Sequence, residues 1–219
     1  MPLDYQSPKD ATPEKLKRLR MNWFGPSRAD VWRSLADEMH ARYETGGFWR
    51  GDRVVADVPP WQVVLDTFTV STGETSSTYT RMRAPYVNAD GFRFTIFRNH
   101  IFTGLAKFLG MQDVEVGYAA FDEAFVIKGN SESKLRQLFA NARLRELLAA
   151  QPSVYFSVKD DEGTFRKTFP EGVDELYFQV GGVVKDIDRL KLMYELFGET
   201  LEELCRMGSA YDQEPGVSI

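Results

Sequence analysis

The sequence predicts an α+β fold, in which a mostly antiparallel sheet built from a meander and hairpins is covered by amphipathic helices and completed by a long C-terminal helix. Residues 53–98 alternate with a period of two and are rich in Val, Thr, Phe and Tyr, which is typical of strands. The breaks between these strands are short, and parallel neighbours would need a long crossover. Residues 186–207 carry an uninterrupted apolar stripe at helical spacing.

The N-terminal part of the chain predicts helices. The Thr-Pro-Glu sequence at residues 12–14 is typical of a helix start, so we expect residues 1–11 to be disordered and a short basic helix to follow. Apolar side chains recur at helical spacing over residues 31–43, which predicts a second helix, and Ser27 can cap its start. The glycine pair at residues 46–47 is expected to end it.

Four strands are expected next, separated by short segments rich in Pro, Gly, Asn and Asp: 53–58, 61–70, 78–83 and 92–98. In the last of them Phe92, Phe94 and Ile96 share one face, whereas Arg93 and Thr95 share the other. This alternation indicates a sheet that is buried on one side.

The C-terminal half continues with helices and strands. The expected helices are 101–109, one that begins at Ser131 and a second that ends before Pro152; the expected strands are 114–118, 121–128, 154–159, 164–169 and 176–180. The final helix carries the apolar stripe Ile187, Leu190, Tyr194, Phe197, Leu201 and Leu204. We expect residues 12–208 to form a single domain and the polar tail 209–219 to be disordered.

Part of this half resembles a known family. The sequence Phe-Asp-Glu-Ala-Phe-Val-Ile-Lys-Gly-Asn at residues 121–130, the leucine-rich helices that follow, and residues 182–190 are similar to an uncharacterised bacterial domain family. Some members of that family carry membrane-spanning helices ahead of the domain, which this sequence lacks. The resemblance covers roughly the C-terminal half and consists of core-type residues, so it implies a fold more than a function.

Composition and charge narrow the function classes. The net charge of -5 argues against a general attraction to nucleic acid or anionic lipid, because phosphates bind a local excess of Lys and Arg. The single cysteine excludes an internal disulfide and a multi-thiolate zinc site. No apolar run approaches the roughly 20 residues that span a bilayer. With no signal-peptide pattern in residues 1–20, the sequence predicts a soluble, cytoplasmic protein.

The residues that most often carry catalysis or bind metals each have a structural interpretation, which we favour. His40 and His100 have no second His or Cys at ligand spacing, so we expect capping or surface roles and no metal site. Cys205 lies beside the apolar stripe of the last helix and is expected to be a buried, inert thiol. The glycine pair 181–182 lacks the rest of a phosphate-binding fingerprint, and the Arg-Gly-Asp sequence at 50–52 is interpreted as a turn. We therefore expect no cofactor.

One cluster of basic and aromatic residues is a candidate ligand-binding site: Tyr79, Arg81, Arg83, Arg93 and Arg98. Alternation places the first three on one face of their strand and Arg93 on the polar face of the next. If the two strands pair, three arginines form a positive patch on a sheet, a surface that can bind single-stranded nucleic acid. The alternative, which we favour, is an ion network with nearby carboxylates: Asp66, Glu74 and Asp90.

These observations predict a non-enzymatic binding or scaffold domain whose partner is an unidentified protein or small molecule. One alternative is a lipid- or membrane-proximal module, which an internal cavity lined by Phe94, Phe97 and Phe108 would favour. The other is an enzyme with a carboxylate and arginine site that only folding assembles, such as a deep cleft that contains Asp66, Arg81 and Arg93 with perturbed ionisation. The sequence leaves the oligomeric state open.

Overall fold

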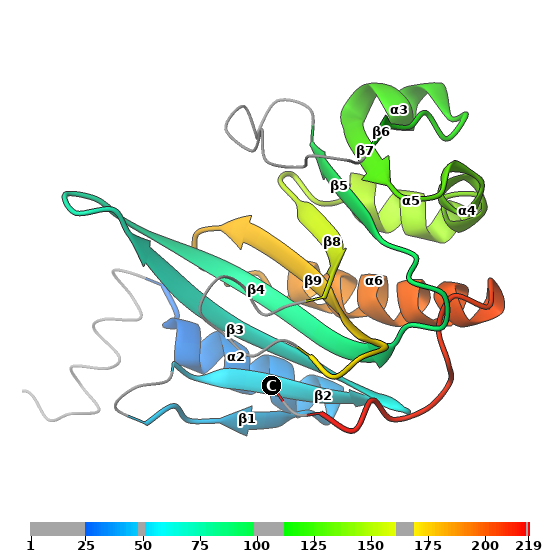
Figure 1. Ribbon diagram of the computed structural model, residues 1–219. Helices are drawn as coiled ribbons and strands as arrows, with labels where there is room; N and C mark the ends of the chain where they lie inside the picture. The colour runs from blue at the N-terminus through cyan, green and yellow to red at the C-terminus, as the bar shows by residue number, and fades with distance from the viewer. Residues whose placement is uncertain (1–24, 48–50, 99–111, 161–168, 218) are drawn as a thin grey trace, which may run out of the picture.

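The computed structural model describes residues 25–47, 51–98, 112–160, 169–217 and 219. Within these residues nine strands form one antiparallel sheet in the order β1-β2-β3-β4-β9-β8-β5-β7-β6. Helices α2 (Arg28–Met39) and α6 (Ile187–Arg206) lie behind the sheet in the view of Figure 1, and α6 crosses behind β9 and β8. The α+β fold that the sequence predicts is confirmed.

The strands in chain order are β1 (Arg42–Glu44), β2 (Arg53–Val58), β3 (Trp61–Ser71), β4 (Ser76–Val87), β5 (Phe94–Arg98), β6 (Gln112–Asp113), β7 (Phe125–Gly129), β8 (Tyr155–Lys159) and β9 (Val173–Gly181). The helices of the described residues are α2 (Arg28–Met39), α3 (Ala119–Ala124), α4 (Glu132–Leu138), α5 (Ala142–Ala149) and α6 (Ile187–Arg206).

Strands β2, β3 and β4 form the predicted meander, but β5 does not continue it. Strand β9 pairs with β4 instead, and β5 lies between β8 and β7. The side chains of β5 explain this central position. Phe94 and Ile96 pack in the main core, while Phe97 joins a separate apolar cluster on the other face. A strand that is apolar on both faces is suited to the middle of a sheet.

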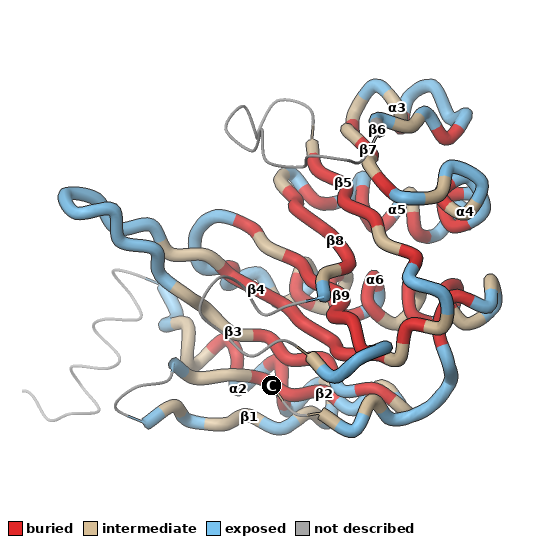
Figure 2. The backbone as a smooth tube through the Cα atoms, in the orientation of Figure 1, coloured by how far each residue is buried: buried red, intermediate tan, exposed pale blue. Residues whose placement is uncertain are grey.

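The main core lies between the sheet and α6. Its helix side includes side chains of α6 with no exposed surface: Leu190, Phe197, Leu201 and Leu204. The ring of Phe197 meets that of Phe156 on β8 edge to face, with centroids 5.7 Å apart. Figure 2 shows the buried residues concentrated along the strands and the facing side of α6. The predicted apolar stripe is therefore confirmed, although Ile187 at its start is only half-buried.

Helix α2 begins as predicted but ends earlier. Ser27 caps it by accepting a hydrogen bond from the N–H of Asp30. The helix ends at Met39 because His40 adopts the left-handed conformation, with φ at 53°. Tyr43, which continues the helical spacing in the sequence, instead lies in β1. Tyr43 therefore packs against the main core from a strand and not from a helix.

The strands predicted at residues 114–118 and 121–128 are largely wrong. Only Gln112–Asp113 and Phe125–Gly129 are strands, and residues 119–124 form helix α3. The carboxylate of Asp122 accepts hydrogen bonds from three successive N–H groups, those of residues 116, 117 and 118, at 2.9 to 3.0 Å. These bonds hold the backbone directly before α3 in a turn, so this segment does not continue as a strand.

The C-terminal tail also differs from the expected disorder. Ser209 and Ala210 are buried, and the N–H of Tyr211 donates to the carbonyl oxygen of Val87 at 3.0 Å. The tail then reaches β2, where a guanidinium nitrogen of Arg53 lies 2.6 Å from the carbonyl oxygen of residue 219. The expectations for residues 1–14, 101–109 and 164–168 lie outside the described residues.

Replacing the most central side chain of α6 tests the core. We expect Phe197→Ala to lower the free energy of unfolding by about 3 to 5 kcal/mol, the usual effect of truncating a buried aromatic ring. Urea denaturation measures it. The matched control Glu202→Ala changes an exposed position of the same helix and should leave the midpoint unchanged. Equal midpoints for the two variants would contradict the assignment of α6 to the core.

Candidate functional site

Four charged side chains form what we call the ion-pair ladder: Asp66 on β3, Arg81 and Arg83 on β4, and Glu175 on β9. Asp66 lies opposite Arg81 in the sheet register. Glu175 lies opposite Pro85, which is the next residue after Arg83 on the same face of β4. The register of three strands therefore brings the four charges together.

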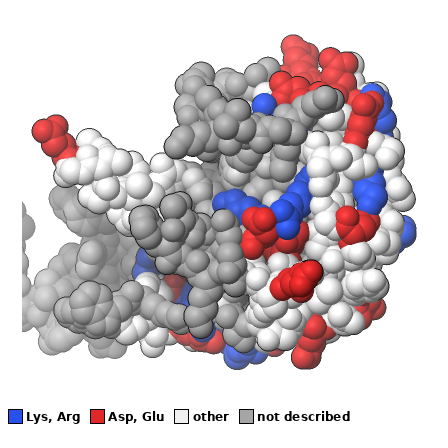
Figure 3. Space-filling model, in the orientation of Figure 1, with Lys and Arg blue, Asp and Glu red and all other residues white. Residues whose placement is uncertain are grey.

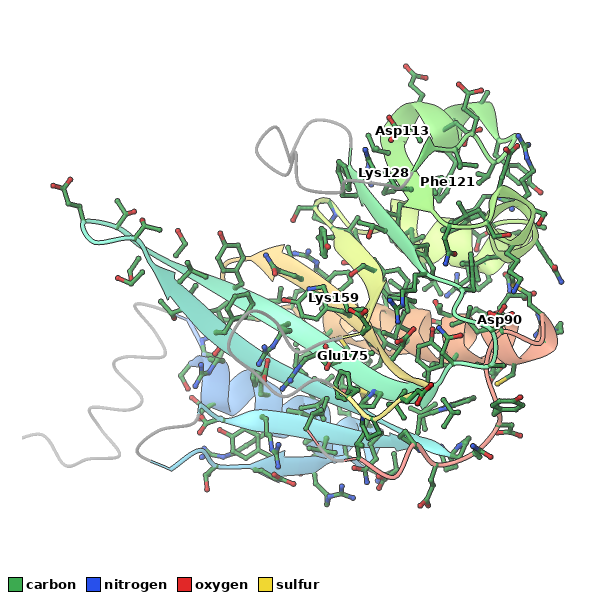
Figure 4. All side chains as sticks on the ribbon, in the orientation of Figure 1. Asp90, Asp113, Phe121, Lys128, Lys159 and Glu175 are labelled. Carbon is green, nitrogen blue, oxygen red and sulfur yellow. The ribbon has the colours of Figure 1, made fainter. Side chains whose placement is uncertain are left out.

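The ladder lies on the face of the sheet opposite the main core. Met82 and Phe178 alternate with ladder residues along β4 and β9, and both pack in the core with α6. The ladder side chains must therefore point to the other face. Glu175 and Lys159 mark this face in Figure 4. Basic and acidic side chains lie next to one another near the centre of the same view in Figure 3, without a separate patch of one sign there.

The two arginines of the ladder are held inside it. Arg81 donates from Nε to Oδ1 of Asp66 at 2.7 Å and from Nη2 to Oδ2 at 2.6 Å. Arg83 donates to the same Oδ2 at 2.9 Å, and its other terminal nitrogen lies 3.7 Å from Glu175. Arg81 and Arg83 are 7% and 5% exposed. Such bidentate pairs are the stronger kind of charged hydrogen bond, so the guanidinium positions are fixed.

Asp66 and Arg81 remain ionised at neutral pH. Burial opposes the charge of Asp66, but hydrogen bonds and positive charge from Arg81 and Arg83 outweigh it and lower the pKa of the carboxyl. Burial also opposes the charge of Arg81, and Asp66 reverses this effect, so the pKa of Arg81 is raised. A general acid or base needs a pKa near the working pH. These shifts fit a fixed charged surface and not proton transfer.

An aromatic pair continues the ladder toward the end of the β3–β4 hairpin. The rings of Phe68 and Tyr79 are stacked, with centroids 5.2 Å apart. The guanidinium carbon of Arg81 lies 5.1 Å from the centroid of the Phe68 ring. The predicted grouping of Tyr79 with Arg81 and Arg83 on one face is thus what the register produces.

A second aromatic group borders the ladder on the side of β8. Tyr155 and Tyr177 meet edge to face at 6.1 Å, and they form a small apolar cluster with Phe97. The ammonium nitrogen of Lys159 lies 3.2 Å from the centroid of the Tyr177 ring. Burial raises the pKa of Tyr177, so its phenol stays neutral. The ladder charges therefore lie on β3, β4 and β9, and aromatic side chains continue the same face onto β8 and β5.

Arg93 does not belong to this group, because the strand pairing on which a patch of three arginines depends is not formed. Arg93 directly precedes β5, which is separated from β4 by β9 and β8. Arg93 donates two hydrogen bonds to Asp174, each 3.0 Å long, and one to Asp160 at 2.7 Å. The two strands that the sequence predicted as neighbours, β4 and β5, do not pair. Strand β9, which is distant in the sequence, lies beside β4 instead. Arg98 donates to the carbonyl oxygens of Ala149 and Gln151.

The remaining candidates that lie in the described residues have structural contacts, and His100 lies outside these residues. His40 caps α2, and the thiol of Cys205 is half-buried, with a pKa raised by burial. Asp52 of the Arg-Gly-Asp sequence accepts a hydrogen bond from Tyr43 at 2.6 Å. Gly182 donates its N–H to the carbonyl oxygen of Thr78 at 2.8 Å. The described residues contain no group of three or more His, Cys, Asp or Glu that could hold a metal ion.

A cleft of about 370 Å³ lies beside the ladder. Its floor includes Gln62 and Pro85, which share the ladder face, and its walls are the turn Pro59–Pro60–Trp61 and residues 214–217. Sequence reasoning missed this cleft because the tail that forms one wall was expected to be disordered. The signal that the sequence offers is a proline on each wall, the pair Pro59–Pro60 on one and Pro215 on the other.

The two structural features that would favour the alternative functions are not formed as expected. Phe94 packs in the main core and Phe97 in the cluster on the opposite face, so they do not line one cavity. Phe108 lies outside the described residues. Arg81 binds Asp66 and Arg93 binds Asp174, so the expected group of Asp66, Arg81 and Arg93 is not formed.

The chain was compared with known proteins. No protein-family model matches it, and no curated protein matches it. Among solved structures, the crystal structure of the mycobacterial trehalose monomycolate transport factor A, TtfA, aligns with a TM-score of 0.46 and 9% identity over 80% of this chain and 95% of that chain. A similarity this low does not carry a ligand or partner across. None of the described helices has the length and apolar composition needed to cross a membrane.

Removing the acceptor of the ladder should destabilise the fold strongly. Asp66→Asn leaves two buried guanidiniums without their shared carboxylate, and the loss of one partner of a buried ion pair costs about 3 to 5 kcal/mol. Urea denaturation at neutral pH measures the loss. Glu195→Gln is the control, because it removes the carboxylate from an exposed pair with Arg143 and should leave stability unchanged. A ladder variant as stable as that control would show that the charges are solvated.

We expect the stability lost in the Asp66→Asn variant to depend on pH. Because the pKa of Asp66 is lower in the folded state, its contribution is fully present above the unfolded pKa of about 3.9 and is lost as the pH falls through the folded value. The difference in unfolding free energy between the parent and Asp66→Asn should therefore be constant above about pH 5 and shrink at lower pH. Urea titrations across this range measure it. A difference that does not change with pH would contradict the ionised ladder.

Proposed function

We propose that this chain is a non-enzymatic binding domain and that the face carrying the ion-pair ladder is its binding surface. The main support is the burial of Arg81, Arg83 and Glu175 beside the half-buried Asp66, on the sheet face opposite α6. For stability alone, apolar side chains of similar volume serve as well or better than buried ion pairs. A charged network that holds guanidiniums in fixed positions instead fits a surface that recognises a partner by geometry.

The chemistry of the face favours recognition over catalysis. Asp66 and Arg81 are held in their charged forms and Tyr177 in its neutral form. None of these groups is shifted toward neutral pH, as proton transfer would require. Hydrogen bonding and stacking, in contrast, need donors, acceptors and rings that stay in one state and one place.

A polypeptide fits this face better than a polyanion. Nucleic acid binding needs positive charge that is free to contact phosphates, whereas Arg81 and Arg83 share a carboxylate and the chain carries a net charge of -5. Protein interfaces are enriched in Tyr, Phe and Arg, the residue types of this face. The neighbouring cleft of about 370 Å³ offers a pocket in which one anchor side chain of a partner can be buried.

The proposal predicts a partner whose binding depends on the ladder. The tagged chain and a double variant, Asp66→Asn with Arg81→Gln, are purified from the same cells, and bound proteins and small molecules are identified by mass spectrometry. Removing both charges together leaves Arg83 beside the carboxylate of Glu175, and Asn keeps the size of Asp66. We expect a bound protein to fall by about tenfold or more in the double variant, as for the loss of an interface hot spot. An unchanged circular dichroism spectrum establishes that the variant is folded.

The matched control removes an ion pair from the helical side, Arg143→Gln with Glu195→Gln, and should retain the partner. A partner that both variants retain would place the binding surface elsewhere. Chemical conversion of a bound small molecule would favour the enzyme alternative. Co-sedimentation with vesicles of phosphatidylcholine and phosphatidylglycerol, equal for the parent and the ladder variant, would favour the lipid-proximal alternative.

A further inference from the structure

The end of the β3–β4 hairpin, residues 67–80, projects beyond the sheet and is called the arm. The register of β2 with β3 ends at Leu65, and that of β4 with β9 begins at Thr80. Residues 69–77 are exposed without interruption. Figures 1 and 2 show the arm extending away from the body of the molecule. Beyond Thr67, the outer edge of β3 has no neighbouring strand in the described part of the chain.

The arm is a formed hairpin and not a loose loop. Its strands remain paired as far as Ser71 opposite Ser76. The hydroxyl oxygens of Thr69 and Thr78 lie 3.0 Å apart across the strands, and the N–H of Thr72 donates to the carbonyl oxygen of Thr75 at 2.9 Å. A paired hairpin presents its outer N–H and C=O groups in the spacing that another strand requires.

The outer edge of β3 presents the backbone groups of Thr69 and Ser71. Backbone groups of successive residues in a strand point to alternate sides, and residues of one cross-strand pair point alike, both toward or both away from each other. Gly182 donates to the carbonyl oxygen of Thr78, so Thr78 points away from β3. Thr69 lies opposite Thr78 and therefore points away from β4, as does Ser71 two residues later.

The usual protection of an exposed edge is missing from the arm. Natural edge strands carry lysines, prolines or bulges that prevent pairing with another chain. The arm contains no Lys, Arg or Pro, its register is continuous, and Glu74 in the tip is its one charged residue. Val70, between the two outward-pointing residues, is 44% exposed. An uncharged edge with an exposed β-branched side chain is suited to pairing.

We propose that the arms of two copies of this chain pair antiparallel along β3, with Val70 of one copy opposite Val70 of the other. This two-fold arrangement places Thr69 of each copy opposite Ser71 of its partner, so the outward N–H and C=O groups bond with each other. The two Val70 side chains lie next to each other across the strands and become less exposed to water. Thr67, which accepts a hydrogen bond from Arg28 at 2.8 Å, keeps this contact. A second copy fits because the edge is complementary to itself in this register.

Sedimentation equilibrium tests the proposal on the full chain. We expect the weight-average mass to rise from one chain toward two over about 10 µM to 1 mM, because the paired segment is short and small interfaces are transient. Val70→Lys should abolish the rise, since two lysines would face each other. The control Ser77→Lys alters the residue that lies opposite Val70 within the same hairpin, away from the outer edge, and should retain the rise. A parent that stays monomeric, or a Val70→Lys variant that still dimerises, overturns the proposal.

Disulfide trapping tests the register independently. In a Cys205→Ser background, Val70→Cys should form a disulfide-linked dimer on oxidation, because opposed residues of this type have Cα atoms about 4.5 Å apart, within the range of disulfides. Ser77→Cys, equally exposed on the same face, should yield at least about tenfold less, since three strand spacings separate it from its copy. Equal yields for the two cysteines would overturn the register.

Discussion

The pairing of β9 with β4 is the constraint on which the rest of the structure depends. This contact joins segments about ninety residues apart, from Thr80 opposite Val180 to Val87 opposite Val173. It brings Glu175 beside Arg83 and places Phe178 in the core, and β9 leads directly into α6. Without it, β4 would be an edge strand and the ladder would end at Arg83. The core on one face and the charges on the other are therefore two results of one register.

Local signals predicted those elements that local interactions determine. Ser27 and Asp186 cap their helices in the structure, and β2 begins and ends at the predicted residues, since side-chain caps, prolines and strand alternation act over a few positions. The errors lie where a side chain makes an unforeseen bond. Asp122 accepts hydrogen bonds from three N–H groups directly before α3, in a segment whose sequence resembles a strand. His40 ends α2 by adopting the left-handed conformation, which is uncommon for a residue other than glycine.

The candidate site was predictable only in part, for the same reason. Alternation along one strand placed Tyr79, Arg81 and Arg83 together, and the short hairpin made Asp66 their natural partner. Glu175 comes from the far end of the chain, and the wall of the cleft comes from the C-terminal tail. Neither is visible in a local pattern. The separation of Arg93 likewise follows from β9 and β8, which no periodicity around Arg93 could indicate.

The ladder lies at the base of the arm, on the same two strands, β3 and β4. Asp66 and Arg81 form the last charged pair before the arm leaves the sheet, and the stacked rings of Phe68 and Tyr79 follow directly on the same face. A bidentate ion pair at this base restricts the direction in which the hairpin can point, because both oxygens and both nitrogens must stay aligned. A buried ion pair adds little stability compared with apolar packing but imposes a stricter geometry. That preference for geometry over stability suits a hairpin that must present a straight, unprotected edge at a fixed angle.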